Sequence, residues 1–175
     1  MNKFITLVAV VLSMGYNSNN NTLQTEIPLQ KEISIKEDPY SLKLQIEKLK
    51  SNTYNFVITI ELNNNAHYVS PNSKGDYKGR LSFSIEDDTK FYSNGNLIEN
   101  PLSTESIDSF NGGKVNLVTK NTTYTQQFTL SDTSDFEVAG LIKFVIEPRC
   151  TMENIPFKIV NRAGTLEIVQ LHTNN

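Results

Sequence analysis

The chain has 175 residues and a formal net charge of −3, which predict a single domain and exclude the clustered basic surface of a nucleic-acid-binding protein. Hydrophobic residues make up 38% of it, enough for one folded core. One cysteine and two histidines exclude a disulfide framework within the chain and a cysteine-based zinc site, so we predict no metal or other cofactor.

The first fifteen residues are typical of a secretory signal peptide. Lys3 supplies a positive start, and residues 4–14 form an apolar run that is shorter than the roughly 20 residues a membrane span needs. Ser13 and Gly15 place small residues just before a cut after Gly15. We therefore expect a signal peptide at residues 1–15 and a periplasmic or secreted protein, with membrane contact only if the signal stays uncut.

The segment that follows is polar. Residues 11–17 resemble a bacterial lipoprotein signal in which Tyr16 stands where the acylated cysteine would be, and without that sulfur no lipid is attached there. Residues 16–40 are rich in Asn, Thr, Glu and Lys and are predicted to be a flexible tether. Within it, Ile33 and Ile35 are a weak signal for an edge strand.

From residue 41 to residue 175 the chain alternates apolar and polar residues in short runs separated by turn residues. Alternation with a period of two is typical of half-buried strands. About eight or nine short strands are predicted between residues 42 and 169, of which residues 54–62 form the longest alternating run. No stretch of ten or more residues has the apolar spacing of a helix, so we predict an all-β, antiparallel sandwich.

The sequence also predicts turns, a central strand and core residues of this sandwich. The runs on either side of residues 50–53 predict a long β-hairpin, and Asn94-Gly95 predicts a second, tight one. The run at 140–146 is apolar on both faces, which favours a central strand. We expect a core that includes Phe56, Ile58, Phe83 and Phe144.

Residues 140–157 (GLIKFVIEPRCTMENIPF) hold the clearest functional signal. Gly140 opens a strand that leads to Cys150, and residues 66–71 (AHYVSP) form a second, partial match. From about Leu42 to Val160 the sequence resembles the N-terminal immunoglobulin-like domain of the bacterial thiol:disulfide interchange protein DsbD. The resemblance implies an immunoglobulin-like β-sandwich with a binding site at one end, formed by His67, Tyr68, Arg149 and Cys150.

The chain departs from that family at the reactive centre. The family reaction needs two cysteines, one to attack a disulfide and one to resolve the mixed disulfide. If Cys150 is the first, Ile155 occupies the second position; if the strand phase from Gly140 is followed, Glu147 and Met152 occupy the two positions. Neither alignment gives a pair. The resemblance therefore implies the fold without a complete catalytic site.

We accordingly expect an accessory module of the cell envelope that acts through contacts with a partner protein. The alternative is a thiol–disulfide exchange component in which Cys150 forms mixed disulfides with a partner, itself a thiol–disulfide protein. Three interpretations of Cys150 stay open: an inert residue, a disulfide between chains, or a reactive thiol. Arg149 is expected to lower the pKa of this thiol, while Glu147 and Glu153 are expected to oppose that effect.

Two further patterns have a functional and a structural interpretation. His67 could act as a catalytic base together with a carboxylate from Asp76 or Glu147. A single histidine at a strand end, however, favours a structural role. The acidic run at residues 86–88 lacks the spacing of a calcium loop and is predicted to be a solvated turn.

Overall fold

The computed structural model describes residues 32–86, 88–107 and 113–171. The predicted signal peptide and most of the predicted tether lie outside these residues. The described residues form thirteen strands and one short 3₁₀ helix, η1 (Asp88–Lys90), which precedes β6. None of their helical residues forms a segment long and apolar enough to cross a membrane.

The first sheet is antiparallel and has the predicted long hairpin at its centre. Its strands are β1 (Glu32–Glu37), β2 (Tyr40–Lys50), β3 (Thr53–Leu62), β10 (Thr122–Leu130), β6 (Phe91–Ser93) and β7 (Ile98–Asn100). β2 and β3 pair from Tyr40↔Leu62 to Lys50↔Thr53. The side chains of both strands alternate, so that one apolar face of the hairpin lies on the core. This regular alternation is the pattern from which the hairpin was predicted.

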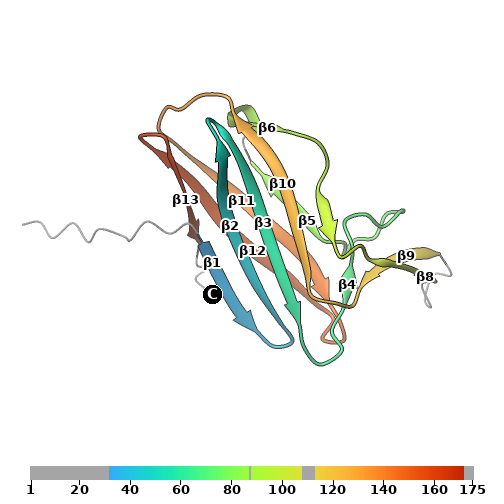
Figure 1. The fold of residues 1–175 in the computed structure, drawn as a ribbon. Helices are drawn as coiled ribbons and strands as arrows, with labels where there is room; N and C mark the ends of the chain where they lie inside the picture. The colour runs from blue at the N-terminus through green and yellow to red at the C-terminus, as the bar shows by residue number, and fades with distance from the viewer. Residues whose placement is uncertain (1–31, 87, 108–112, 172–175) are drawn as a thin grey trace, which may run out of the picture.

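The second sheet packs against the first as the other layer of the sandwich (Figure 1). Its order is β13 (Thr165–Gln170), β12 (Thr151–Arg162), β11 (Phe136–Ile146) and β5 (Ser82–Ile85). β11 lies between two neighbours, as its apolar sequence predicted. The prediction of an antiparallel, immunoglobulin-like β-sandwich is confirmed.

A small third sheet projects beside one end of this sandwich, and we call it the arm (Figure 1). It consists of β4 (Tyr68–Val69), β9 (Lys114–Val118) and β8 (Thr104–Ile107), in that order. β8 pairs with β9 from Thr104↔Leu117 to Ile107↔Lys114. β8 lies in a region whose sequence shows no strand pattern.

The core between the two main sheets contains the side chains that the sequence placed there. Phe56, Ile58 and Phe144 are at most 1% exposed. Phe83 is half-buried and stacks on Phe157 with 5.8 Å between ring centroids. The buried faces of the corresponding strands were therefore predicted correctly.

The prediction of a tight hairpin at Asn94-Gly95 is wrong. β6 and β7 do not pair with each other; both pair antiparallel with β10, one after the other along its edge. They therefore run in the same direction as a single interrupted edge strand. Gly95, with a φ of 88°, allows the chain to leave and rejoin that edge, which is why an Asn-Gly pair occurs here without a hairpin.

The sandwich also includes part of the segment that was predicted to be a tether. β1 pairs with β2 from Glu32↔Gln45 to Glu37↔Tyr40, and Ile33 is only 2% exposed. The boundary predicted at residue 41 is thus too late, because residues 32–40 belong to the domain. A six-residue strand with two apolar residues among charged ones carries too little alternation to be separated from a polar linker.

The long hairpin yields a test of the core. Replacing Ile58 with Ala should lower the free energy of unfolding by about 2–5 kcal/mol, the usual effect of a cavity at a fully buried isoleucine. Ile98→Ala, at a side chain that is 65% exposed, is the control and should change it by about 0.5 kcal/mol or less. Urea denaturation measures both; a loss below about 1 kcal/mol for Ile58→Ala would contradict the assigned core face.

Candidate functional site

A groove of about 520 Å³ lies between the arm and the end of β11. This volume is within the range of ligand and peptide pockets. The lining is mostly apolar, with polar groups at a few points. It comprises Tyr68, Val69, Gly79, Ile107, Val115, Leu117, Val145 and Pro148, together with His67, Tyr77, Lys78, Glu147 and Cys150.

Backbone pairing brings these distant segments together. His67 N donates to the Glu147 carbonyl (3.1 Å) and Glu147 N donates to the His67 carbonyl (2.9 Å), so the chain entering β4 pairs with the chain leaving β11. Val145 N donates to the Gly79 carbonyl at 2.9 Å. A Cβ at Gly79 would lie 2.7 Å from Val145 Cγ2, so this close approach requires glycine.

A buried carboxylate joins the arm to the sandwich. Glu99 on β7 is 4% exposed, and both of its oxygens accept hydrogen bonds. The donors are Ser70 Oγ (3.0 Å), Asn72 Nδ2 (2.9 Å) and Ser103 Oγ (3.1 Å) to Oε2, and Tyr124 Oη (3.0 Å) to Oε1. Ser70 and Asn72 follow β4 and Ser103 precedes β8. Because a buried carboxylate is costly unless it is fully hydrogen-bonded, these donors hold the two arm strands at β7.

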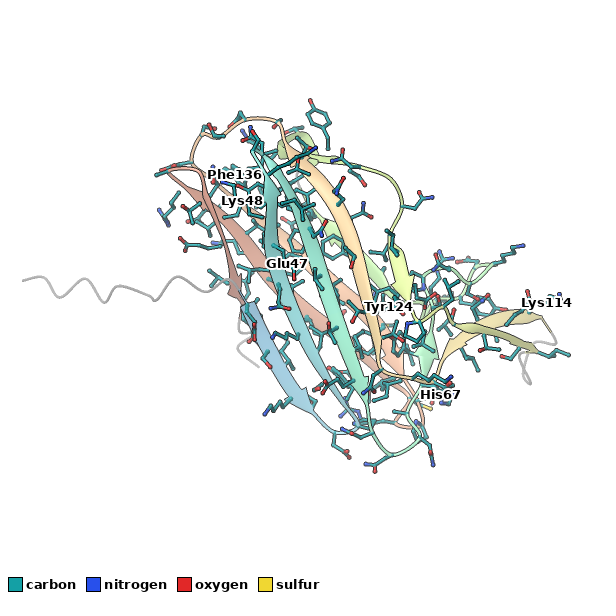
Figure 2. The ribbon with its side chains drawn as sticks, in the orientation of Figure 1. Glu47, Lys48, His67, Lys114, Tyr124 and Phe136 are labelled. Carbon is teal, nitrogen blue, oxygen red and sulfur yellow. The ribbon has the colours of Figure 1, made fainter. Side chains whose placement is uncertain are left out.

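Two tyrosines extend this network into the core. The Tyr68 and Tyr124 hydroxyls lie 3.1 Å apart, and both side chains are at most 1% exposed. Burial raises the pKa of both phenols well above the usual value, so both keep their protons. Figure 2 shows Tyr124 inside the sandwich near the base of the arm and His67 at the sandwich end below it.

Cys150 lies at the end of the turn between β11 and β12, with a φ of 54°, and its side chain is exposed. Its Sγ donates to Glu147 Oε2 at 2.8 Å. This hydrogen bond, together with desolvation and the negative charge of Glu147, raises the pKa of the Cys150 thiol. The thiol is therefore held in its protonated, less nucleophilic form.

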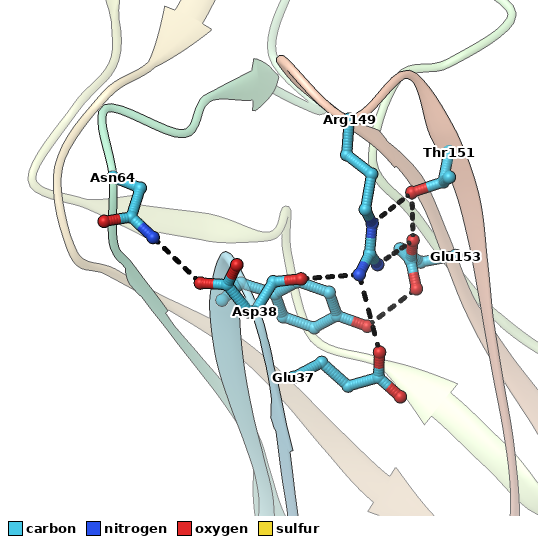
Figure 3. A network of polar contacts seen from close by, with 7 residues as sticks. Glu37, Asp38, Asn64, Arg149, Thr151 and Glu153 are labelled. Carbon is cyan, nitrogen blue, oxygen red and sulfur yellow. Dashed lines mark hydrogen bonds and ion pairs between the residues drawn. The ribbon is translucent and has the colours of Figure 1, made fainter.

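The expected lowering of the Cys150 pKa by Arg149 is contradicted, because the guanidinium is engaged elsewhere (Figure 3). It donates to Glu153 Oε1 (2.6 Å) and to Thr151 Oγ1 (2.7 Å), and it also contacts Glu37 and the Asp38 carbonyl. Tyr40 Oη donates to Glu153 Oε2 at 2.9 Å. Burial of Glu153 works against these bonds, but together they lower its pKa. Arg149 thus fixes the β11–β12 turn to the turn between β1 and β2.

The four predicted site residues therefore do not all lie at one site. His67, Tyr68 and Cys150 line the same groove, although most of Tyr68 belongs to the core. Arg149 belongs to the ion-pair network on the other side of the turn. His67 shares a backbone bridge with Glu147, and among the described residues no hydrogen bond or ion pair joins the side chains of His67 and Asp76.

Neither alignment of the DsbD cysteine positions places a second reactive group beside Cys150. Ile155 is 5% exposed and pairs with Ile142, and Met152 pairs with Val145. Asp87 of the predicted acidic turn lies outside the described residues. The residues missed from the sequence are Glu99 and Ile107, which lie in the region that showed no strand pattern.

Comparisons with known proteins give a likeness of fold alone. No family model and no curated protein matches the chain. The N-terminal periplasmic domain of ScsB from Proteus mirabilis is similar with a TM-score of 0.47 and 7% identity, over 80% of this chain and 51% of that one. This chain thus spans about half of that domain. The GAE domain of GGA2p from Saccharomyces cerevisiae is similar with a TM-score of 0.38 and 8% identity, over 81% and 97% of the two chains.

The bond between Cys150 and Glu147 can be tested through the reactivity of the thiol. Glu147→Gln removes the negative charge and the strongest acceptor, so the pKa of Cys150 should fall and its alkylation by iodoacetamide near pH 8 should become faster. The pH dependence of the alkylation rate measures this shift. Glu47→Gln, at an exposed carboxylate on β2, is the control. An unchanged pH profile in Glu147→Gln would show that Glu147 does not control the thiol.

Proposed function

We propose that this protein is an exported accessory module of the bacterial cell envelope that binds a partner protein in the groove beside the arm. The observation that carries this proposal is an apolar groove with a large apolar side chain left in solvent at its rim. Ile107 is 77% exposed. Apolar surface of this kind, placed beside a hollow, is characteristic of interaction sites.

The distribution of polar groups fits a protein partner. Val69, Leu117 and Val145 form the apolar part of the groove, while Lys78 and Glu147 add charges at its border. Protein interfaces typically have such an apolar centre and a polar rim. Export rests on the sequence of residues 1–15, and we infer a mature chain that starts near Tyr16.

A second function is supported by the exposed thiol in the same groove. The Cys150 thiolate would attack one sulfur of a partner's disulfide, form a mixed disulfide and release the other sulfur as a thiolate. A thiol from outside the chain would then displace Cys150, because the described residues hold no second cysteine. The hydrogen bond to Glu147 disfavours the first step by raising the pKa of the thiol. We therefore place non-covalent binding first.

Photo-crosslinking in the native envelope tests the binding function. A benzoylphenylalanine at position 107 should give a crosslinked partner, and the same residue at position 92, where Tyr92 is 63% exposed on β6, should not. The Cys150→Ser variant should give the same crosslink, because binding does not use the thiol.

An insulin-reduction assay with dithiothreitol separates the two functions. The purified protein should not accelerate the reaction beyond the reductant alone. Turnover that disappears in Cys150→Ser would replace the binding function with the thiol–disulfide function. If position 107 gives no crosslink above position 92, the groove is not the docking site.

A further inference from the structure

The free edge of the arm defines the kind of partner that fits the groove. We propose that the partner contributes an extended segment, which pairs with β8 as a fourth strand of the arm and places its side chains on the groove. This inference rests on the proposed binding function and specifies the occupant.

β8 is the outermost strand of the arm. One of its edges pairs with β9 along its whole length, and in the described part of the chain no strand pairs with its other edge. Three of its four residues are exposed. An edge of this kind presents unpaired backbone N–H and C=O groups, and another extended chain satisfies them most directly.

The edges of the first main sheet are protected in ways that β8 is not. β1 lies against β13 of the opposite sheet, and the edge formed by β6 and β7 is interrupted at residues 94–97. β8 (TESI) has neither proline nor bulge. Its single charge, Glu105, is paired across the arm with Lys114 at 2.7 Å. Apart from its short length of four residues, β8 therefore lacks the usual devices that prevent strand addition.

The position of β8 links this edge to the groove. Val115 and Leu117 of β9 line the groove, and their register partners Ser106 and Thr104 on β8 lie on the same face of the arm. Ile107, the last residue of β8, borders the groove at the end of that strand. Side chains alternate between the two faces of a strand, so an added strand places every second side chain on the groove face of the arm. Backbone pairing with β8 and side-chain burial in the groove would then act together.

The edge is also held in position before any partner arrives. Ser103, the residue just before β8, donates to the buried Glu99 carboxylate at 3.1 Å. Tyr77 Oη donates to the carbonyl of Lys114 at 2.8 Å, which holds the start of β9. A preformed edge loses little conformational entropy on binding, and this favours recognition of an otherwise unstructured segment.

The test uses the full chain and random peptides of about ten residues, the upper length of a typical strand, displayed on phage. Selected peptides should alternate apolar and polar residues and lack proline at their centre. On binding, the β8 amides that point toward its free edge, which are every second one, should exchange with solvent at least about tenfold more slowly. Ile107→Lys should weaken binding about tenfold or more, while Ile98→Lys, at a similarly exposed isoleucine on β7, should have little effect.

Three outcomes would overturn the inference. These are the absence of any enriched peptide, selected peptides that leave β8 exchange unchanged, and equal losses in Ile107→Lys and Ile98→Lys. If position 107 still crosslinks a partner in the envelope, the binding function survives such an outcome and the partner uses a folded surface. If the crosslink also fails, both proposals fail.

Discussion

The buried side chain of Glu99 is the constraint on which the position of the arm and its groove depends. The sandwich is stabilised by its core, but the arm is a small sheet of short strands that projects from it. Such a sheet has little core of its own and needs anchoring. Four donors converge on Glu99, three of them from segments that flank arm strands. Without these bonds a buried carboxyl group would be left without hydrogen-bond partners, so the arm position and the burial of Glu99 require each other.

The turn between β11 and β12 divides its polar residues between two tasks. Arg149 connects the turn with Glu153 and with the β1–β2 turn, which fixes the sandwich end. The backbone of Glu147 pairs with that of His67, and its carboxylate accepts a hydrogen bond from the Cys150 thiol, which keeps the thiol in the groove and protonated. A surface built for dithiol chemistry needs a stabilised thiolate, whereas this arrangement stabilises the thiol.

The sequence predicted those parts of the fold that carry a long regular pattern. The β2–β3 hairpin was correct because alternation persists across two long strands, and β11 was placed centrally because both of its faces are apolar. Ile33 and Ile35 gave only a weak signal for β1, and β8 was missed, because short strands at an edge show little alternation. The prediction of a hairpin at Asn94-Gly95 was wrong because a glycine with positive φ occurs both in tight hairpins and where an edge strand is interrupted. Only the pairing of β6 and β7 with β10 distinguishes the two cases.

For the candidate site, the sequence indicated which residues lie at strand ends, but it did not indicate which side chains they contact. His67 and Cys150 were singled out, and they do line one groove. Arg149 was grouped with them because it adjoins Cys150, yet its guanidinium binds Glu153 instead. Glu99 could not be recognised, since one glutamate in an irregular stretch looks the same whether solvated or buried. Its role follows mainly from contacts with Ser70, Asn72 and Tyr124, which lie far from it in the sequence.

The most direct test is amide hydrogen exchange in Glu99→Gln, with Glu47→Gln, at an exposed carboxylate on β2 outside the arm, as control. Glutamine has almost the same shape, but it presents a donor where Ser70, Asn72 and Ser103 also donate. The account predicts faster exchange in β4, β8 and β9 with unchanged exchange in β2, β3 and β11. Unchanged exchange in the arm, or equal acceleration throughout the domain, would contradict the claim that Glu99 holds the arm and its groove in place.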